Sequence, residues 1–230
     1  WRALPFLLGG ILGITILLPL FYEEVFDVGE AGRGVLLAFN EPFQILGLLV
    51  GIPIATRLIR TKPSRVLSFF ALCATVAAGG YVVVATAPSV AVAAVGSAVV
   101  ALSVSVLIPG YATLSSLIVP PRVRSFAFSV NELWAIPGLV FVVVAARVGD
   151  VHGLRWGIAS MIPVFLLGAY LLASAGRLVA ADIRSAQLGA LAQADALVAR
   201  REGRSKLLVC RGLDVHYGQV QVLFGVDFDV

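Results

Sequence analysis

Six long apolar runs constrain the fold of this 230-residue chain more than any other feature. The hydrocarbon core of a bilayer is about 30 Å thick, so a helix that crosses it needs roughly 20 apolar residues. Strands of a membrane barrel would alternate apolar and polar residues over roughly 10 positions, whereas these runs are continuous. The sequence therefore predicts an all-α membrane protein with six transmembrane helices, at approximately Leu4–Phe21, Gly34–Thr56, Val66–Ala87, Val90–Leu117, Ser125–Ala146 and Leu154–Ala175.

Composition agrees with a protein embedded in the lipid bilayer. Charged residues make up 13% of the chain, against about 25% in soluble domains. No basic run interleaved with aromatic residues occurs, so nucleic acid is not an expected partner. Cys73 and Cys210 lie in very different settings, and His152 and His216 are isolated. These residues indicate neither a disulfide nor a metal site, and no grouping of Ser, His and Asp suggests a hydrolase.

The loop charges indicate how the helices are oriented. Lys and Arg concentrate on the cytoplasmic loops of membrane proteins. In this chain they gather after spans two, four and six, whereas the loop after span one is acidic. Both termini are therefore predicted to be cytoplasmic, in a multi-pass protein of the cell inner (plasma) membrane. The basic residues are Arg57, Arg60, Lys62, Arg65, Arg122, Arg124 and Arg177, and the acidic ones are Glu23, Glu24, Asp27 and Glu30.

A ten-residue pattern occurs in both the second and the fifth span. Residues Asn40–Leu49 and Asn131–Val140 both read N-E-x-aromatic-x-I-x-G-L-aliphatic. Matching Ile, Gly and Leu would be common in such a composition, but an Asn-Glu pair inside a span is rare and costly. The two segments are three helices apart, and three is an odd number. The second triplet of helices is therefore predicted to cross the membrane in the opposite direction, as an inverted repeat.

The polar residues of this repeat are candidates for a transport path or its gates. At about 1.5 Å per residue, Glu41 and Glu132 each lie roughly 10 Å from the membrane face where their span begins, on opposite sides of the midplane. Coincidence, or hydrogen bonds that only hold helices together, are the alternatives. Gln44 is expected on the same helix face as Glu41. The candidate set is Asn40, Glu41, Gln44, Asn131, Glu132 and Trp134.

Six spans in inverted triplets, with a basic loop between spans two and three, resemble the carboxy-terminal half of a major facilitator superfamily transporter. Gly51, Arg57 and Arg60 align loosely with that family's G-x-x-x-D-R-x-G-R-R cytoplasmic gating loop, although its aspartate and second glycine are absent. The resemblance implies that Glu41 and Glu132 face the transport path or its gates. The resemblance covers residues 1–176, the predicted six-helix half-transporter. It also implies the lipid bilayer and a missing amino-terminal half as partners, and a small-molecule substrate that no motif identifies.

The rest of the chain changes character. Residues 177–205 are rich in alanine and charge, which predicts a cytoplasmic linker helix. Residues 206–230 alternate as two strands around a Tyr-Gly turn, which predicts a hairpin. The string Y-G-x-x-x-V-L-x-G-V-D-F from Tyr217 to Phe228 resembles the start of an ABC-type ATPase domain of branched-chain amino acid importers, an α/β domain. An ordinary edge hairpin is the alternative.

That second resemblance implies that Tyr217 stacks on the adenine of ATP and that the remainder of the ATPase domain is a partner. No phosphate-binding G-x-x-x-x-G-K-[ST] loop precedes Val230, so this stretch alone is not expected to hydrolyse ATP. A start at Trp1 and an end within a strand pattern predict a fragment of a longer polypeptide. The leading hypothesis is a solute transporter with a fused ATP-binding domain. An ABC permease fused to its ATPase, and a membrane sensor or scaffold with a nucleotide-binding tail, are the alternatives.

Overall fold

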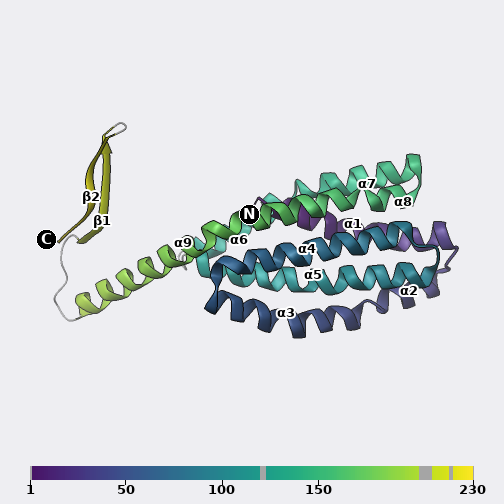
Figure 1. Cartoon of the computed structure of the whole chain (residues 1–230), viewed down its shortest axis with the longest axis horizontal. Helices are drawn as coiled ribbons and strands as arrows, with labels where there is room; N and C mark the ends of the chain where they lie inside the picture. The colour runs from purple at the N-terminus through teal and green to yellow at the C-terminus, as the bar shows by residue number, and fades with distance from the viewer. Residues whose placement is uncertain (1, 120–122, 202–208, 218–219, 230) are drawn as a thin grey trace. The chain divides into compact units, whose positions relative to one another are not determined.

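The computed structural model describes residues 2–119, 123–201, 209–217 and 220–229. The chain divides into two compact units, Trp1–Ile183 and Arg184–Val230. The first unit is helical, and the second contains the end of the last helix and two strands. Each unit is described by itself below, and Figure 1 labels the elements.

Within the described residues, six helical segments are long and apolar enough to cross a membrane. This confirms the six predicted spans, although most of them extend further than predicted. Spans two, five and six each contain two helices. The helices are α1 (Leu4–Phe26), α2 (Glu30–Ala38), α3 (Glu41–Thr61), α4 (Pro63–Thr86), α5 (Val90–Ile118), α6 (Arg124–Ala135), α7 (Gly138–His152), α8 (Leu154–Ala159) and α9 (Met161–Arg201). Span two is α2 with α3, span five is α6 with α7, span six is α8 with the start of α9, and spans one, three and four are α1, α4 and α5.

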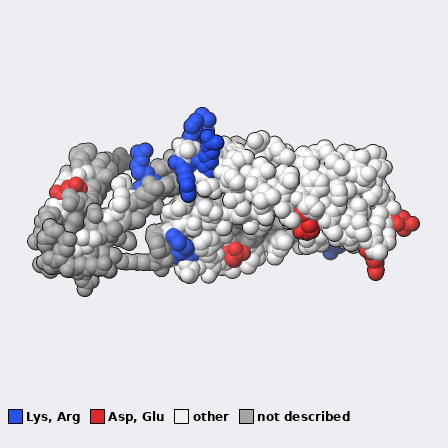
Figure 2. Space-filling model, turned by 90° about the horizontal axis from the view of Figure 1, so that it is seen from below, with Lys and Arg blue, Asp and Glu red and all other residues white. Residues whose placement is uncertain are grey.

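The two ends of the helical unit differ in charge. Successive spans run in alternate directions, so the connections after spans two and four lie at the same end (Figure 1). Figure 2 shows Lys and Arg side chains gathered at that end and acidic side chains extending toward the other. We call the first the basic end, which carries Lys62, Arg65 and Arg124, and the second the acidic end, which carries Glu23, Glu24, Asp27 and Glu30.

The connection at the basic end between spans two and three is much shorter than predicted. Helix α3 continues to Thr61, and Lys62 is the only residue between it and α4. Pro63 is the first residue of α4, and a proline disfavours helical geometry in the residue that precedes it. Lys62 accordingly has φ −143° and ψ 70°. Arg57 and Arg60 are therefore helical rather than part of a loop, and Gly51 lies within the span, as its predicted bounds had it.

Prolines explain where the spans are interrupted. Proline has no N–H group to bond to the carbonyl four residues earlier, and its ring clashes with that carbonyl. Span two is interrupted at Phe39–Asn40, just before Pro42, and span five is interrupted at Ile136–Pro137. Ser160 interrupts span six ahead of Pro163. Each of the two spans that carry the repeated pattern therefore loses regular helical hydrogen bonding close to its Asn-Glu pair, although the backbone at both places keeps right-handed helical φ and ψ.

The core of the helical unit lies where spans one, three and six meet. Tyr81 on α4 is fully buried, and its hydroxyl donates a hydrogen bond to the carbonyl of Gly10 on α1. The ring of Phe165 on α9 packs 5.3 Å from the Tyr81 ring. A Cβ on Gly10 would lie 2.3 Å from the Phe165 ring, so the glycine is required for this packing. Buried aromatic rings thus hold these three spans together.

Spans two and five lie on opposite sides of the unit and are its least covered helices (Figure 1). In their most apolar windows 17% and 18% of the residues are buried, against 39–56% in the other spans. The exposed side chains include Ile45 and Leu49 on α3 and Val140 and Val143 on α7. Apolar exposure of this kind suits a lipid environment, in which these faces need no protein cover.

Two glycines at the same position of the repeated pattern lie at close helix crossings. A Cβ on Gly47 would lie 2.4 Å from the carbonyl oxygen of Leu102 on α5. A Cβ on Gly138 would lie 2.4 Å from the carbonyl oxygen of Pro5 on α1. Small residues allow helix backbones to approach this closely in membranes. Spans two and four, and spans one and five, are therefore packed backbone against backbone.

The second unit contains two antiparallel strands, β1 (Val209–Tyr217) and β2 (Val220–Asp229). Val209 lies opposite Asp229 and Tyr217 opposite Val220, with irregular register between. The Gly218 and Gln219 turn lies outside the described residues. Helix α9 runs without interruption from span six to Arg201, so the predicted linker helix at 177–205 is the end of α9 rather than a separate element, as far as it is described.

The glycine crossings lead to a prediction about stability. We expect Gly138→Ala to lower the free energy of unfolding by about 1–3 kcal/mol, because the new methyl group would overlap the Pro5 carbonyl. Gly79→Ala on α4 is the matched control, since its Cβ would meet nothing within 4 Å and alanine is a better helix former by about 0.5–1 kcal/mol. Thermal unfolding in detergent micelles measures both. Equal midpoints for the two variants would contradict the close crossing.

Candidate functional site

Asn40 lies at the break between α2 and α3 and is buried. The hydroxyl of Ser97 on α5 lies 3.0 Å from Asn40 Oδ1 and 2.9 Å from the carbonyl oxygen of Ala94, so its one proton is shared between these two acceptors. The hydroxyl of Tyr22 on α1, which is fully buried, lies 3.3 Å from the same Ser97 oxygen. Spans one, two and four are therefore joined by one chain of polar groups inside an apolar unit.

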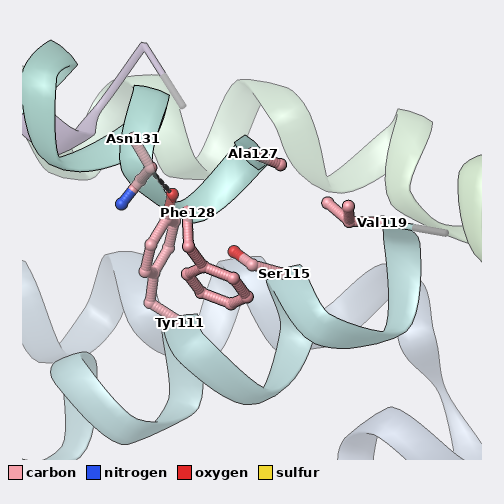
Figure 3. Close-up of a pocket in the computed structure, with 6 residues that line it drawn as sticks. All are labelled: Tyr111, Ser115, Val119, Ala127, Phe128 and Asn131. Atoms are coloured by element: carbon pink, nitrogen blue, oxygen red, sulfur yellow. Dashed lines mark hydrogen bonds between the residues drawn. The ribbon is translucent and has the colours of Figure 1, made fainter. Parts of the chain in front are cut away.

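Asn131 occupies the matching position in span five and is also buried. The hydroxyl of Tyr111 on α5 donates a hydrogen bond to Asn131 Oδ1 (Figure 3). Figure 3 shows the ring of Phe128 beside that of Tyr111, in a narrow gap between α5 and α6 that has no room for a water molecule. Asn131 therefore joins spans four and five as Asn40 joins spans two and four, although its contact with the tyrosine is direct.

The contacts of the two asparagines on α5 show how far apart the asparagines lie along the axis of that helix. Asn40 bonds to Ser97 and Asn131 to Tyr111, and these two residues are 14 positions apart on α5 (111 − 97). At a rise of 1.5 Å per residue, the bonding points are separated by about 21 Å along that helix. The asparagines therefore lie in opposite halves of the helical unit, Asn40 toward the acidic end and Asn131 toward the basic end.

The glutamate beside each asparagine is exposed. Glu41 accepts a hydrogen bond from Gln44 Nε2 at 3.2 Å, so these two side chains do share a face of α3, as predicted. Glu132 borders a cavity, and Trp134 two positions later is 49% exposed. In both segments the amide, rather than the carboxylate, is the group that the protein buries and bonds. The Glu132 carboxylate takes part in no hydrogen bond or ion pair within the described residues, whereas Glu41 is bonded to Gln44.

A cavity of about 270 Å³ opens beside Asn131 and Glu132. Its walls are formed by the start of α1 and the second half of α5, with contributions from α6 and α9. The side chains of Tyr111, Asn131 and Glu132 form its polar part, and the rest of the lining is apolar. The other lining residues are Ala3, Leu4, Leu7, Leu8, Ile11, Leu107, Ile108, Ala112, Phe128 and Leu172.

A second cavity, of about 250 Å³, lies next to Asn40, between the start of span two and the first half of α5. Its lining is entirely apolar, and Glu41 does not take part in it. The lining residues are Phe39, Phe43, Val95, Ala98, Val99 and Leu102. The two matched segments thus each border a cavity of similar size, but only the cavity in the basic half has a carboxylate in its wall.

The residues predicted for a gating loop have separate positions on α3. Gly51 is buried, and a Cβ there would lie 2.4 Å from a methyl group of Val106 on α5. The need for a glycine at position 51 is therefore explained by helix packing. Arg57 and Arg60 are exposed near the end of α3, at the basic end of the unit. No contact brings either arginine to Asn40, Glu41 or the cavities among the described residues. Tyr217, the predicted adenine contact, ends β1, and its side chain lies outside the described part.

Sequence reasoning missed the partners of the asparagines. Tyr22 precedes Asn40 by 18 positions, and Tyr111 precedes Asn131 by 20. Each tyrosine lies on the span before its asparagine. The two spacings differ by two positions, so Tyr111 does not fall at the position that a displacement of 91 residues gives for Tyr22, and the sequence offered only a weak signal. Ser97 had no comparable signal, since serine is common in α5 and bonds to Asn40 only through the crossing of spans two and four.

Arg155 near the start of span six is a further residue that sequence reasoning overlooked. Its Nη1 donates a hydrogen bond to the carbonyl of Ala85 at 3.0 Å, and its guanidinium lies 5.7 Å from the ring centres of Phe21 and Phe26. A guanidinium above aromatic rings is attracted by their π-faces. Arg155 therefore ties spans one, three and six together near the acidic end.

Within the part of the chain that is described, no group of three or more His, Cys, Asp and Glu side chains could hold a metal ion. No family model, no curated protein and no solved structure matches this chain. The site must therefore be interpreted from its own geometry. That geometry is two matched polar anchors, each at a broken span and each beside a cavity.

The contact between Tyr111 and Asn131 can be tested by a double-mutant cycle with Tyr111→Phe and Asn131→Leu. Hydrogen bonds between membrane helices contribute about 0.6 kcal/mol on average and up to about 1.7 kcal/mol. We expect a coupling energy in that range, measured by unfolding in mixed micelles. Tyr170→Phe, at a tyrosine that is 68% exposed on α9, replaces Tyr111→Phe in the control cycle and should give none. A coupling energy near zero in the first cycle would contradict the hydrogen bond between Tyr111 and Asn131.

Proposed function

We propose that the helical unit is one half of a membrane transporter of the facilitator type, built from two inverted three-helix repeats. The observation that carries this proposal is the depth of the two buried asparagines, whose contacts on α5 lie about 21 Å apart. The contacts themselves do not follow the axis, because Asn40 and Asn131 both bond to span four. Two segments of the same pattern at opposite depths are what a two-fold axis in the membrane plane would produce. Inverted repeats of this kind, with broken helices near the binding site, characterise many secondary transporters.

The pairing of the spans supports the same proposal. An axis that exchanges the triplets would exchange span one with four, two with five and three with six. The packing of span two on four would then become that of span five on one. Gly47 and Gly138 lie at those two crossings. Hydrogen bonding that only holds helices together would explain the asparagines, but it gives no reason for glycines at matching positions.

The proposed orientation places the basic end in the cytoplasm of the cell inner membrane, with a second six-helix half as partner and a small molecule as substrate. Its support is the separation of charges between the ends (Figure 2), because Lys and Arg favour cytoplasmic loops. Spans two and five, as the least covered helices, are suited to border a path between two halves. Alternating access would then rock one half against the other, with Glu41 and Glu132 near the path or its gates.

We propose for the second unit that it begins an ABC-type ATP-binding domain, with Tyr217 against the adenine of ATP. Its support is the string from Tyr217 to Phe228 together with the antiparallel pairing of β1 and β2. The same support favours the second candidate function, an ABC permease fused to its ATPase. A membrane sensor with a nucleotide-binding tail would share both units but move no solute.

Labelling of single cysteines tests the orientation. In a background with Cys73→Ala and Cys210→Ala, we expect Ser89→Cys, exposed in the turn between α4 and α5, to react with a membrane-impermeant maleimide in intact cells. Thr61→Cys, exposed at the basic end, should react only after the membrane is opened, because the basic end is cytoplasmic. The opposite labelling pattern would mean that the basic end faces outward. Equal labelling of the two cysteines in intact cells would contradict the presence of a membrane span, α4, between them.

Uptake into proteoliposomes tests the function, with the protein expressed from its complete gene. We expect at least one solute from a small-molecule cell extract to enter these vesicles faster than protein-free vesicles, as measured by mass spectrometry. Glu41→Gln and Glu132→Gln should each slow that uptake and reduce its dependence on a pH gradient, since each removes a titratable group from the path. Uptake that requires ATP and ignores the gradient would favour the ABC permease, and no uptake would favour the sensor.

A further inference from the structure

We propose that the cavity beside Glu132 binds a small organic cation, a positively charged nitrogen attached to an apolar body. Binding of the cation to the helical unit does not depend on the proposed function. The further step, that this cation is the transported substrate, rests on the proposed function. The geometry of the cavity, its charge and its contrast with the second cavity each support the proposal.

The size and lining of the cavity limit the ligand to a small and largely apolar molecule. Its volume of about 270 Å³ is near the lower end of the range of about 300–1,000 Å³ for small-molecule sites. Side chains of α1 and α5 form apolar walls, among them Leu7, Ile11 and Leu107. Apolar walls with a few polar groups at one place are the usual form of such sites.

The polar part of the cavity selects for positive charge. The 13 lining residues include the carboxylate of Glu132 and contain neither Lys nor Arg. No hydrogen bond or ion pair within the described residues engages that carboxylate, so its charge is available to a ligand. The carboxylate would repel an anion, and a neutral molecule would gain nothing from the charge.

Aromatic rings add a second reason to expect a cation. Tyr111 and Phe128 are among the residues that line the cavity together with Glu132. Rings attract a cationic nitrogen through their π-faces, and quaternary ammonium groups are bound in this way. The hydroxyl of Tyr111 already donates to Asn131 Oδ1, which leaves the two N–H groups of the Asn131 amide for a polar atom of the ligand.

The second cavity shows that this arrangement is not a general consequence of the repeated pattern. It also adjoins an Asn-Glu pair and is of similar volume, about 250 Å³. Its six lining residues are all apolar, and Glu41 instead accepts a hydrogen bond from Gln44. The residue that matches Gln44 in span five is Ala135, which cannot donate a side-chain hydrogen bond. Glu132 therefore lacks the local partner that Glu41 has, and only its cavity is suited to a cation.

Equilibrium binding of benzyltrimethylammonium tests the inference without requiring transport. The probe is measured by calorimetry on the full chain in lipid nanodiscs. Neopentylbenzene, in which a carbon replaces the nitrogen, is the neutral isostere, and phenylacetate is the anionic counterpart. We expect saturable binding of the cation, at least about tenfold weaker binding of the neutral isostere, and no binding of the anion. Glu132→Gln should weaken cation binding about tenfold, a change of about 1.4 kcal/mol.

Two further variants make the result decisive. Asp150→Asn removes the same charge from an exposed position on α7, and binding should be unchanged. Ala112→Phe fills the cavity without altering its charge and should abolish binding, and size-exclusion chromatography checks that each variant is folded. The proposal is overturned if the cation and its neutral isostere bind equally, which would indicate a lipid or other apolar occupant, or if Glu132→Gln binds like the unaltered protein.

Failure of this inference is distinguishable from failure of the proposed function. Cation binding that depends on Glu132, in a protein that moves no solute, would support the site and contradict the transporter. Solute uptake by the complete protein, with cation binding unaffected by Glu132→Gln, would support the transporter and contradict the site.

Discussion

The hydrogen bonding of two buried asparagines is the constraint on which the rest of the helical unit depends. An amide in a bilayer has no water to bond with, and each unsatisfied group costs several kcal/mol. Asn40 and Asn131 sit at breaks or near them, where α2 gives way to α3 and α6 to α7. The hydroxyls of Ser97 and Tyr111 satisfy their oxygens from one helix, α5. Helix α5 must therefore pass close to both broken spans.

Close approach to α5 in turn dictates where small residues are needed. Gly47 and Gly51 face Leu102 and Val106 of α5 with no room for a Cβ. These glycines lie within three turns of Asn40 on α3, so the same helix crossing that satisfies the amide also excludes larger side chains. Packing and polar bonding thus fix one crossing together, and neither could change without the other. This is why spans two and four are tightly joined although the outer face of α3 is exposed.

The fold was more predictable from sequence than the site. Continuous apolar runs predicted all six spans, because the thickness of a bilayer imposes their length. The same reasoning misplaced the end of span two, since Arg57 and Arg60 can extend a helix beyond the apolar core as easily as they can form a loop. At the site, the pattern drew attention to two segments that each contain a buried, hydrogen-bonded asparagine, but charge favoured the glutamates. The asparagines are the buried members, and only the packing against α5 could reveal Ser97 as a partner.

The differences between the two matched segments are as informative as the likeness. Near Asn40, Ser97 lies between the amide and Tyr22, and the cavity is apolar. Glu41 accepts a hydrogen bond from Gln44. Near Asn131 the tyrosine bonds directly, and the carboxylate of Glu132 borders a cavity that contains no cationic side chain. A repeat kept only for folding would have no reason to differ in this way. Under the proposed function, these two segments would divide their roles, one of them packing helices and the other offering a charge.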